Sequence, residues 1–268
     1  MRMKYSLALI FAVIFTISSF ARAQATVGLA PAMIVKDFVP GKPLEFEVVV
    51  SNALASPVSM HSQVRDWWYD KNNQKTFDEP GSHSNSAANW IQVVPEQVDI
   101  TAQTSQKVKV LVTPPSKAVG GYYCVIFFES RPVATGQNTA EGKPIFTNFR
   151  LGTLVMLNAK GTEHFEIKVT AKTFEPPGPN RTLNLEFTLQ NLGNSHTFPR
   201  VELSMLNEKK QLMGKADGEY KRFLPEQSDR LKINWGGSLS PGKYTAVLTV
   251  LYGRNQVYTE DFPFEVAQ

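Results

Sequence analysis

Two parts of this chain repeat one plan of strand and turn. The alternating segment 43–52 (PLEFEVVVSN) is echoed by 181–191 (RTLNLEFTLQN), and each segment ends in an asparagine. Further along, 105–123 (SQKVKVLVTPPSKAVGGYY) is echoed by 228–244 (SDRLKINWGGSLSPGKY), where an alternating strand passes through a proline-containing turn and a glycine to a tyrosine. A plan that occurs only twice predicts two copies of one domain type, because a solenoid needs shorter and more numerous units.

The apolar runs of the chain have the lengths and spacing of β-strands. They alternate or are fully apolar, clusters of Pro, Gly, Asn and Asp separate them, and no window shows a helical stripe. They cover residues 44–50, 58–68, 108–112, 122–128, 151–157, 183–189, 231–235 and 244–252. Tyr122-x-Cys124 has the spacing of a tyrosine that locks a sandwich corner, and Trp67 or Trp68 is expected to fill the space between the sheets. We therefore predict an all-β fold of two tandem immunoglobulin-like β-sandwich domains.

The N-terminus has the pattern of a cleaved signal peptide, because Arg2 and Lys4 precede an apolar run that ends in Ala21-Arg22-Ala23. The expected organisation is a signal peptide over 1–23, one sandwich over 24–159 and a second over 160–268. An uncleaved anchor is the alternative. The mature chain would have 245 of the 268 residues, with no further apolar run of membrane-spanning length, so no membrane span is expected in it.

The charge balance argues against nucleic acid as a partner, and the cysteine content excludes an intramolecular disulfide. Without the leader, 25 of the 28 basic residues remain against 24 acidic ones, and no basic cluster follows a phosphate backbone, so nucleic acid is not an expected partner. Cys124 is the single cysteine, which leaves no intramolecular disulfide. It lies within the apolar run YYCVIFF, where we expect a buried and unreactive thiol.

The residues show no recognisable catalytic or metal-binding pattern. The histidines at 61, 83, 164 and 196 lack metal-ligand spacing, and there is no H-E-x-x-H, G-x-S-x-G or phosphate-binding glycine loop. We therefore expect no enzyme, no cofactor and no metal. A hydrolase that uses two carboxylates from distant strands remains an alternative.

The segment 145–157 (IFTNFRLGTLVML) is the candidate binding surface. It is the last strand expected in the first sandwich, and an apolar strand at a sheet edge either aggregates or pairs with a strand of a partner. An ordinary core strand is the alternative. The partner-binding residues that we select are Ile145, Phe149, Arg150, Leu151, Thr153 and Val155.

The first domain resembles the PapD-like periplasmic pilus chaperones through 44–52, 89–95 (NWIQVVP), 108–115 and 122–129. That resemblance implies two immunoglobulin-like domains at an angle, with the last strand of the first domain completing the fold of a pilus subunit. The donor strand would then be 145–157. The family fixes the subunit carboxylate with two basic residues, whereas Pro31, Ala32 and Thr153 stand at the matching places here, so this anchor is not carried over.

The chain also resembles the WxL-interacting cell-surface proteins. The resemblance lies in 120–123 (GGYY), 223–228 (FLPEQS), 233–237 (INWGG) and 239–244 (LSPGKY). It implies binding of peptidoglycan and of partner surface proteins, and neither family is catalytic. Members usually end in a membrane anchor, which this sequence does not show.

These inferences lead to two hypotheses of function. The first is a periplasmic, chaperone-like protein that binds fimbrial or other surface-fibre subunits by β-strand pairing, with outer-membrane assembly machinery as a further partner. The second is a secreted or cell-envelope protein that binds cell-wall glycan or a surface protein through the polar loops 70–89 and 131–143.

Overall fold

The computed structural model describes residues 26–178 and 182–267, so the expected signal peptide lies outside the described residues. Strands dominate this part of the chain, and one short 3-10 helix, Ala88–Trp90, interrupts them. In the same part of the chain, no helix is long and apolar enough to cross a membrane. The all-β prediction is therefore confirmed.

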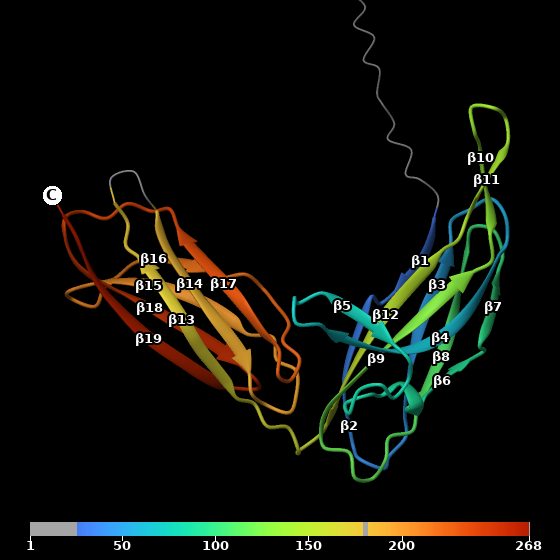
Figure 1. The fold of residues 1–268 in the computed structure, drawn as a ribbon, viewed down its shortest axis with the longest axis horizontal. Coiled ribbons are helices and arrows are strands. Elements are labelled where there is room, and N and C mark those ends of the chain that lie inside the picture. Colours follow the sequence, from blue (N-terminus) through green and yellow to red (C-terminus); the bar gives the residue numbers. More distant parts are fainter. Residues whose placement is uncertain (1–25, 179–181, 268) are drawn as a thin grey trace, which may run out of the picture.

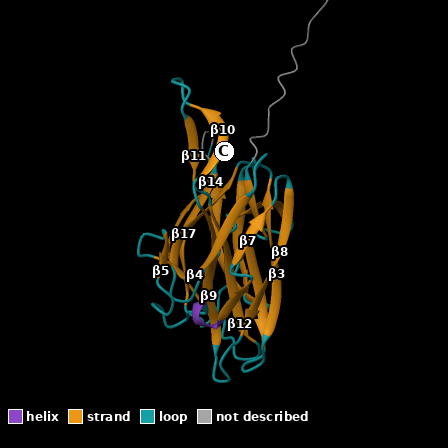
Figure 2. Cartoon of the chain, turned by 90° about the vertical axis from the view of Figure 1, so that its right-hand side faces the viewer, coloured by secondary structure: helices purple, strands orange, loops and turns teal. Residues whose placement is uncertain are grey.

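The first group of strands forms a sandwich of two sheets, with a separate hairpin (Figure 1). One sheet has the order β1 (Val27–Ala30), β3 (Leu44–Asn52), β8 (Thr104–Val112), β6 (Ile91–Val94). The other has the order β2 (Met33–Phe38), β12 (Arg150–Ala159), β9 (Gly120–Ser130), β4 (Val58–Tyr69), β5 (Lys75–Asp78), and β7 (Gln97–Ile100) also pairs with β4. The hairpin of β10 (Val133–Asn138) and β11 (Pro144–Thr147) projects beyond the ends of the sandwich strands (Figure 2).

The second group of strands forms another two-sheet sandwich. One sheet has the order β13 (Ile167–Glu175), β14 (Leu183–Asn191), β17 (Ser228–Trp235). The other has the order β16 (Leu212–Asp217), β15 (Arg200–Asn207), β18 (Gly242–Tyr252), β19 (Gln256–Val266). No strand pairing joins the two groups among the described residues, and the sandwiches diverge from the linker at the bottom of Figure 1. The boundary placed at Ala159 stays a prediction.

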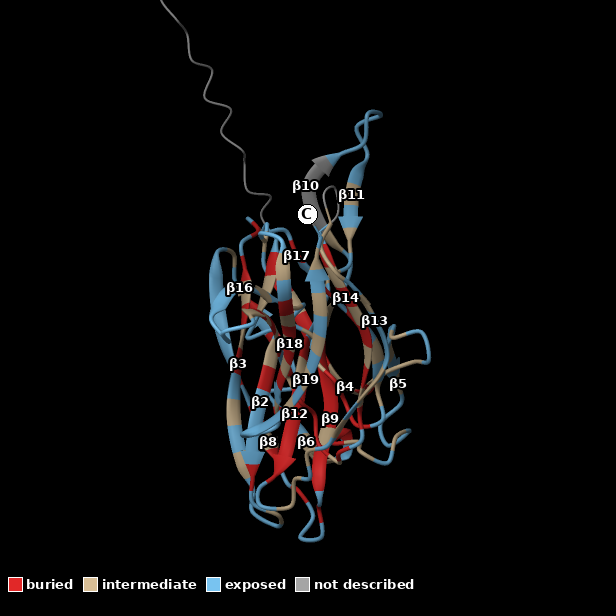
Figure 3. Cartoon of the chain, turned by 90° about the vertical axis from the view of Figure 1, so that its left-hand side faces the viewer, coloured by how far each residue is buried: buried red, intermediate tan, exposed pale blue. Residues whose placement is uncertain are grey.

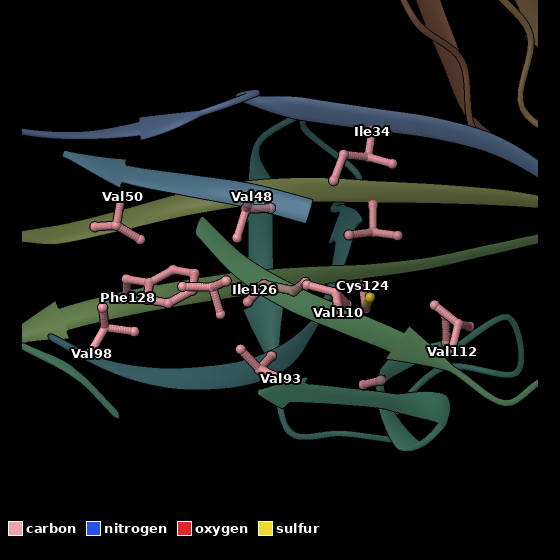
Figure 4. Close-up of a cluster of buried hydrophobic side chains, with 14 of the residues drawn as sticks. Ile34, Val48, Val50, Val93, Val98, Val110, Val112, Cys124, Ile126 and Phe128 are labelled. Atoms are coloured by element: carbon pink, nitrogen blue, oxygen red, sulfur yellow. The ribbon is translucent and has the colours of Figure 1, made fainter. Parts of the chain in front are cut away.

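Alternating apolar side chains fill the space between the two sheets of each sandwich. Val48 and Val110 from one sheet meet Ile126 and Phe128 from the other in the first core (Figure 4), and all four are buried. Cys124 lies in the same core with no exposed surface, and burial, with a contribution from the Asp66 carboxylate, raises the pKa of its thiol. The prediction of a buried thiol is confirmed, and its low reactivity stays a prediction.

The asparagine that ends each repeated strand makes the same contacts in both sandwiches. The Asn52 amide donates to the carbonyl oxygens of Ser56 (2.9 Å) and Ile100 (3.1 Å). The Asn191 amide donates in the same way to Ser195 (2.9 Å) and Phe223 (3.3 Å). Each also accepts a backbone N–H two residues further along the chain. The internal repeat is therefore a repeat of structure.

A tyrosine fixes one corner of each sandwich. The Tyr122 hydroxyl accepts the backbone N–H of Val119 (3.2 Å), whereas the Tyr244 hydroxyl donates to the carbonyl of Ser240 (2.8 Å). The predicted corner is confirmed at Tyr122. Its counterpart at Tyr244 reaches a carbonyl four residues upstream.

The expectation that Trp67 or Trp68 fills the space between the sheets is wrong. Trp67 is buried on the opposite face of its sheet, in a cluster with Tyr123, Met156 and Leu224. Leu224 belongs to the second sandwich, so this cluster lies where the two sandwiches meet. Phe38, Trp90 and Tyr122 form the aromatic group against the first core instead.

Candidate functional site

Strand β12 has two different halves. Leu154 to Ala159 pair in parallel with β2 on one side and antiparallel with β9 on the other. Arg150 to Thr153 pair with β9 alone in the described part of the chain. Figure 3 shows the buried residues of β12 toward its C-terminal end. The candidate edge is therefore confined to the first four residues of the strand.

The chain crosses from one sheet to the other just beside this edge. β1 pairs with β3, and after the cis peptide bond between Ala30 and Pro31 the chain continues as β2 beside β12. The Thr153 hydroxyl donates to the Pro31 carbonyl (2.8 Å), and the Leu154 N–H donates to the Ala32 carbonyl (3.0 Å). From these two hydrogen bonds onward, the chain that leads into β2 covers the edge of β12.

The backbone groups at the open edge follow from strand alternation. Because the Leu154 N–H points away from β9, the N–H and C=O groups of Arg150 and Gly152 point to that same side. Phe149 shows the opposite phase, since its N–H donates to the Ser130 hydroxyl and its carbonyl accepts from the Ser130 N–H. Arg150 and Gly152 thus present two donors and two acceptors in the positions that a further strand would use.

Side chains of the edge alternate between the first core and the outer face of the sheet. Phe149 and Leu151 are half-buried against the first core, and Thr153 and Val155 are fully buried. Of the residues selected from the sequence, Thr153 and Val155 therefore offer no accessible side chain. The single strand expected over 145–157 is also wrong, because Ile145 lies on β11, which pairs with β10.

Arg150 is exposed and is held by two contacts. Its Nε lies 2.6 Å from Glu129 Oε1, and its guanidinium lies over the Phe127 ring at 4.0 Å from the centroid. Phe127 in turn covers Gly152, where a Cβ would lie 2.8 Å from the Phe127 Cε1 atom. Phe77 of β5 meets Phe127 edge to face at 5.0 Å and is 45% exposed.

The sequence did not lead us to expect burial on the outer face of this sheet, the face opposite the first core. The signal was present in the fully apolar run of β9, because a strand covered on both faces has no polar alternation. Val125 and Phe127 on this face are buried, like Ile126 and Phe128 in the first core.

Much of the polar stretch 70–89 packs against the first sandwich. It contains β5, and His83 stacks on Trp68 at 5.4 Å between ring centroids. The buried Asp66 carboxylate accepts the His83 N–H (3.0 Å) and the Ser86 hydroxyl. The stretch 131–143 contains β10 and the turn of the projecting hairpin. Binding of a ligand through these two stretches stays a prediction.

Several acidic residues pair with a basic side chain that favours their charged form. Among the described carboxylates whose pKa shifts, the shift is downward at Glu47, Glu163, Glu186, Glu202 and Glu260. Burial, the largest single cause, raises the pKa of Glu163 and Glu260. Their hydrogen bonds together with the positive charge of Arg254 or Lys172 outweigh it, so the net shift is downward. No group of three or more His, Cys, Asp or Glu side chains in the described residues could hold a metal ion.

No family model and no curated protein matches this sequence. Among solved structures, the class 5 fimbriae chaperone CfaA is similar over 91% of this chain and 100% of its own, with 10% identity and a TM-score of 0.50. This chain has the fold of a two-domain fimbrial chaperone.

Two further solved structures match less closely. One is described as Salmonella enterica SafA pilin in complex with the SafB chaperone, with 10% identity, 90% and 96% coverage of this chain and of that chain, and a TM-score of 0.43. The periplasmic chaperone SfaE has 11% identity, 91% and 100% coverage and a TM-score of 0.40. The resemblance to PapD-like chaperones is confirmed for the fold alone, and through the CfaA structure. The resemblance to WxL-interacting proteins stays a prediction.

Proposed function

We propose that this protein is a periplasmic, chaperone-like binder of surface-fibre subunits, and that it pairs a strand of the subunit with the open edge at Arg150–Thr153. The observation that carries the proposal is the open side of β12, where Arg150 and Gly152 direct backbone donors and acceptors away from β9. An unprotected edge of this kind pairs readily with another chain.

The surroundings of the edge favour an extended apolar segment as its partner. Phe149 and Leu151 are only half-buried, so a strand laid beside them would cover their remaining surface. The solved fimbrial chaperone that shares this fold supports the class of partner. The expected signal peptide supports a periplasmic or secreted location, and outer-membrane assembly machinery is a further proposed partner.

Arg150→Pro tests the pairing at the backbone. Arg150 is the first residue of β12 and its N–H is not used by β9, so proline is tolerated there while the outermost donor of the edge is removed. Arg150→Ala is the matched control, because it loses the same contacts with Glu129 and Phe127 but keeps the N–H.

The measurement is the amount of partner recovered when each variant is co-expressed with the secreted proteins encoded beside it. We expect Arg150→Pro to lower the recovery of partner about tenfold, because one hydrogen bond at the edge is lost. The recovery with Arg150→Ala should be close to that with the original chain. Equal recovery of partner with both variants, at equal thermal stability, would contradict the proposal of edge pairing.

A further inference from the structure

At one point of the junction between the two sandwiches, backbone and small residues make the contact. The loop between β14 and β15 lies against the start of β9, where the Gly121 N–H donates to the Asn194 carbonyl (2.8 Å). Gly120 has a φ of +77°, and a Cβ at this position would lie 2.5 Å from the Asn194 oxygen. A close approach that only glycine permits explains why two glycines precede Tyr122.

Polar side chains are buried inside this junction without full hydrogen bonding. His196 is 4% exposed, Asn158 7% and Tyr123 1%. Asn158 Nδ2 lies 3.5 Å from His196 Nε2. In the described part of the chain, His196 Nδ1 and Asn158 Oδ1 have no hydrogen-bonding partner.

Aromatic rings enclose the imidazole. Tyr123 from the first sandwich and Phe198 from the second meet the His196 ring at 5.7 and 5.5 Å between centroids, both near perpendicular. A cation formed at this place would have little water around it, and an imidazolium needs two acceptors where the neutral ring needs one.

The charged groups that act on His196 are one cation and one anion. Burial, with the Arg222 guanidinium, lowers the pKa of His196 from its usual 6.5 to about 4, while the Asp37 carboxylate of β2 acts in the opposite direction. Tyr123 stays neutral, since burial raises the pKa of its hydroxyl. The imidazole is therefore neutral in the closed junction at pH 7.

We propose that His196 makes the junction between the sandwiches acid-sensitive, so that protonation of its ring separates the two domains while each sandwich stays folded. The ring sits between groups of both domains, and separation would expose it to water. This acid response requires no binding partner. If it is not observed, the proposed pairing of a subunit strand with β12 is unaffected.

The direction of the effect follows from which state binds the proton. An exposed histidine in the open state has a pKa near 6.5, and the closed state has a lower one, so the closed junction is favoured above pH 6.5 and weakens as the pH falls toward 4. The ratio of closed to open molecules should fall by up to about tenfold per pH unit in this window, about 150-fold in all by pH 4.

The test measures the distance between the sandwiches from pH 7.5 to 4. Fluorophores on Gln106→Cys and Asn234→Cys, one exposed position in each sandwich, report the distance by energy transfer, since the buried Cys124 does not compete for label. Far-UV circular dichroism follows the strands in parallel. His196→Gln removes the titrating ring, and His164→Gln is the control, because the His164 side chain is 65% exposed.

We expect the distance to increase on acidification in the original chain and in His164→Gln, and to stay constant in His196→Gln. A constant distance down to pH 4 would overturn the proposal, as would an increase that persists in His196→Gln or a loss of strand signal at the same midpoint. If His196→Gln does not fold, the imidazole protons of His196 are followed by NMR in the original chain. A pKa near 6.5 for the His196 ring, or a titration of the ring that the interdomain distance does not follow, would then contradict the proposal.

Discussion

Asn52 and Asn191 show how a single side chain sets the same corner twice. Each amide bridges a tight turn to a neighbouring segment, and each is 1% exposed. Because the carbonyl and N–H groups that they satisfy are themselves buried, water does not replace the lost bonds when the amide is removed. The repeat in sequence therefore marks residues that stability requires.

Asn191→Ala should lower the free energy of unfolding of the chain by about 1–3 kcal/mol, the cost of leaving buried groups unpaired. The groups affected are the carbonyls of Ser195 and Phe223 and the N–H of Gly193. Urea denaturation followed by circular dichroism measures the change. Asn234→Ala, at an exposed position of β17, is the control and should change stability by less than about 0.5 kcal/mol. Equal effects of the two variants would contradict the role given to Asn191.

At the scale of one residue, structural roles that depend on neighbouring residues of the same strand were predictable from the sequence. Roles that depend on contact with the other domain were not. The spacing of Tyr122 and Cys124 identified a corner and a core position, because both lie on one strand. The face occupied by Trp67 depends on Leu224, which is remote in sequence and belongs to the second sandwich. No local pattern carries that information.

At the scale of elements, the strands were predictable and the pairing of β12 was not. All the apolar runs lie in strands, since period and composition are local properties. The break between β11 and β12, and the parallel cover supplied by β2, depend on a strand that changes sheets at Pro31. As a result, the sequence located the candidate edge but made it too long, and it placed Thr153 and Val155 on a surface that the fold buries.

Gly152→Ala tests how tightly β12 and β9 fit together on the outer face. The added Cβ would lie 2.8 Å from the Phe127 ring and 3.1 Å from a Val125 methyl group, so the ring must leave its place between Phe77 and Arg150. We expect the free energy of unfolding to fall by about 1–3 kcal/mol from this overpacking. The control is Gly236→Ala, where the nearest atom to the added Cβ is 3.9 Å away. A Gly152→Ala chain as stable as the control in urea denaturation would show that the ring moves without cost.

At the scale of the whole molecule, polar contacts between residues far apart in sequence join the sandwiches in addition to the buried cluster around Trp67 and Leu224. The Gly121 backbone meets Asn194, and Arg254 binds both Asp37 and Glu163. In a further contact, the tip of the hairpin between β4 and β5 places Asn73 Nδ2 2.9 Å from the Ser228 carbonyl, and Gln227 donates to Asn73 Oδ1 at 3.2 Å. A hairpin that reads from sequence as a solvent-exposed loop is thus a brace between domains.

Asn73 has two separable functions, because its φ of +57° favours asparagine or glycine and its amide bridges the sandwiches. Asn73→Gly keeps the backbone freedom and loses the bridge, whereas Asn73→Ala loses both. Each lost neutral hydrogen bond contributes about 0.5–1.5 kcal/mol, less where water competes, so both variants should broaden the distribution of interdomain distances in small-angle scattering. Only Asn73→Ala should also lower the thermal stability of the first sandwich, through strain in the turn. An unchanged distance distribution in Asn73→Gly would mean that the other contacts between the domains set their angle without Asn73.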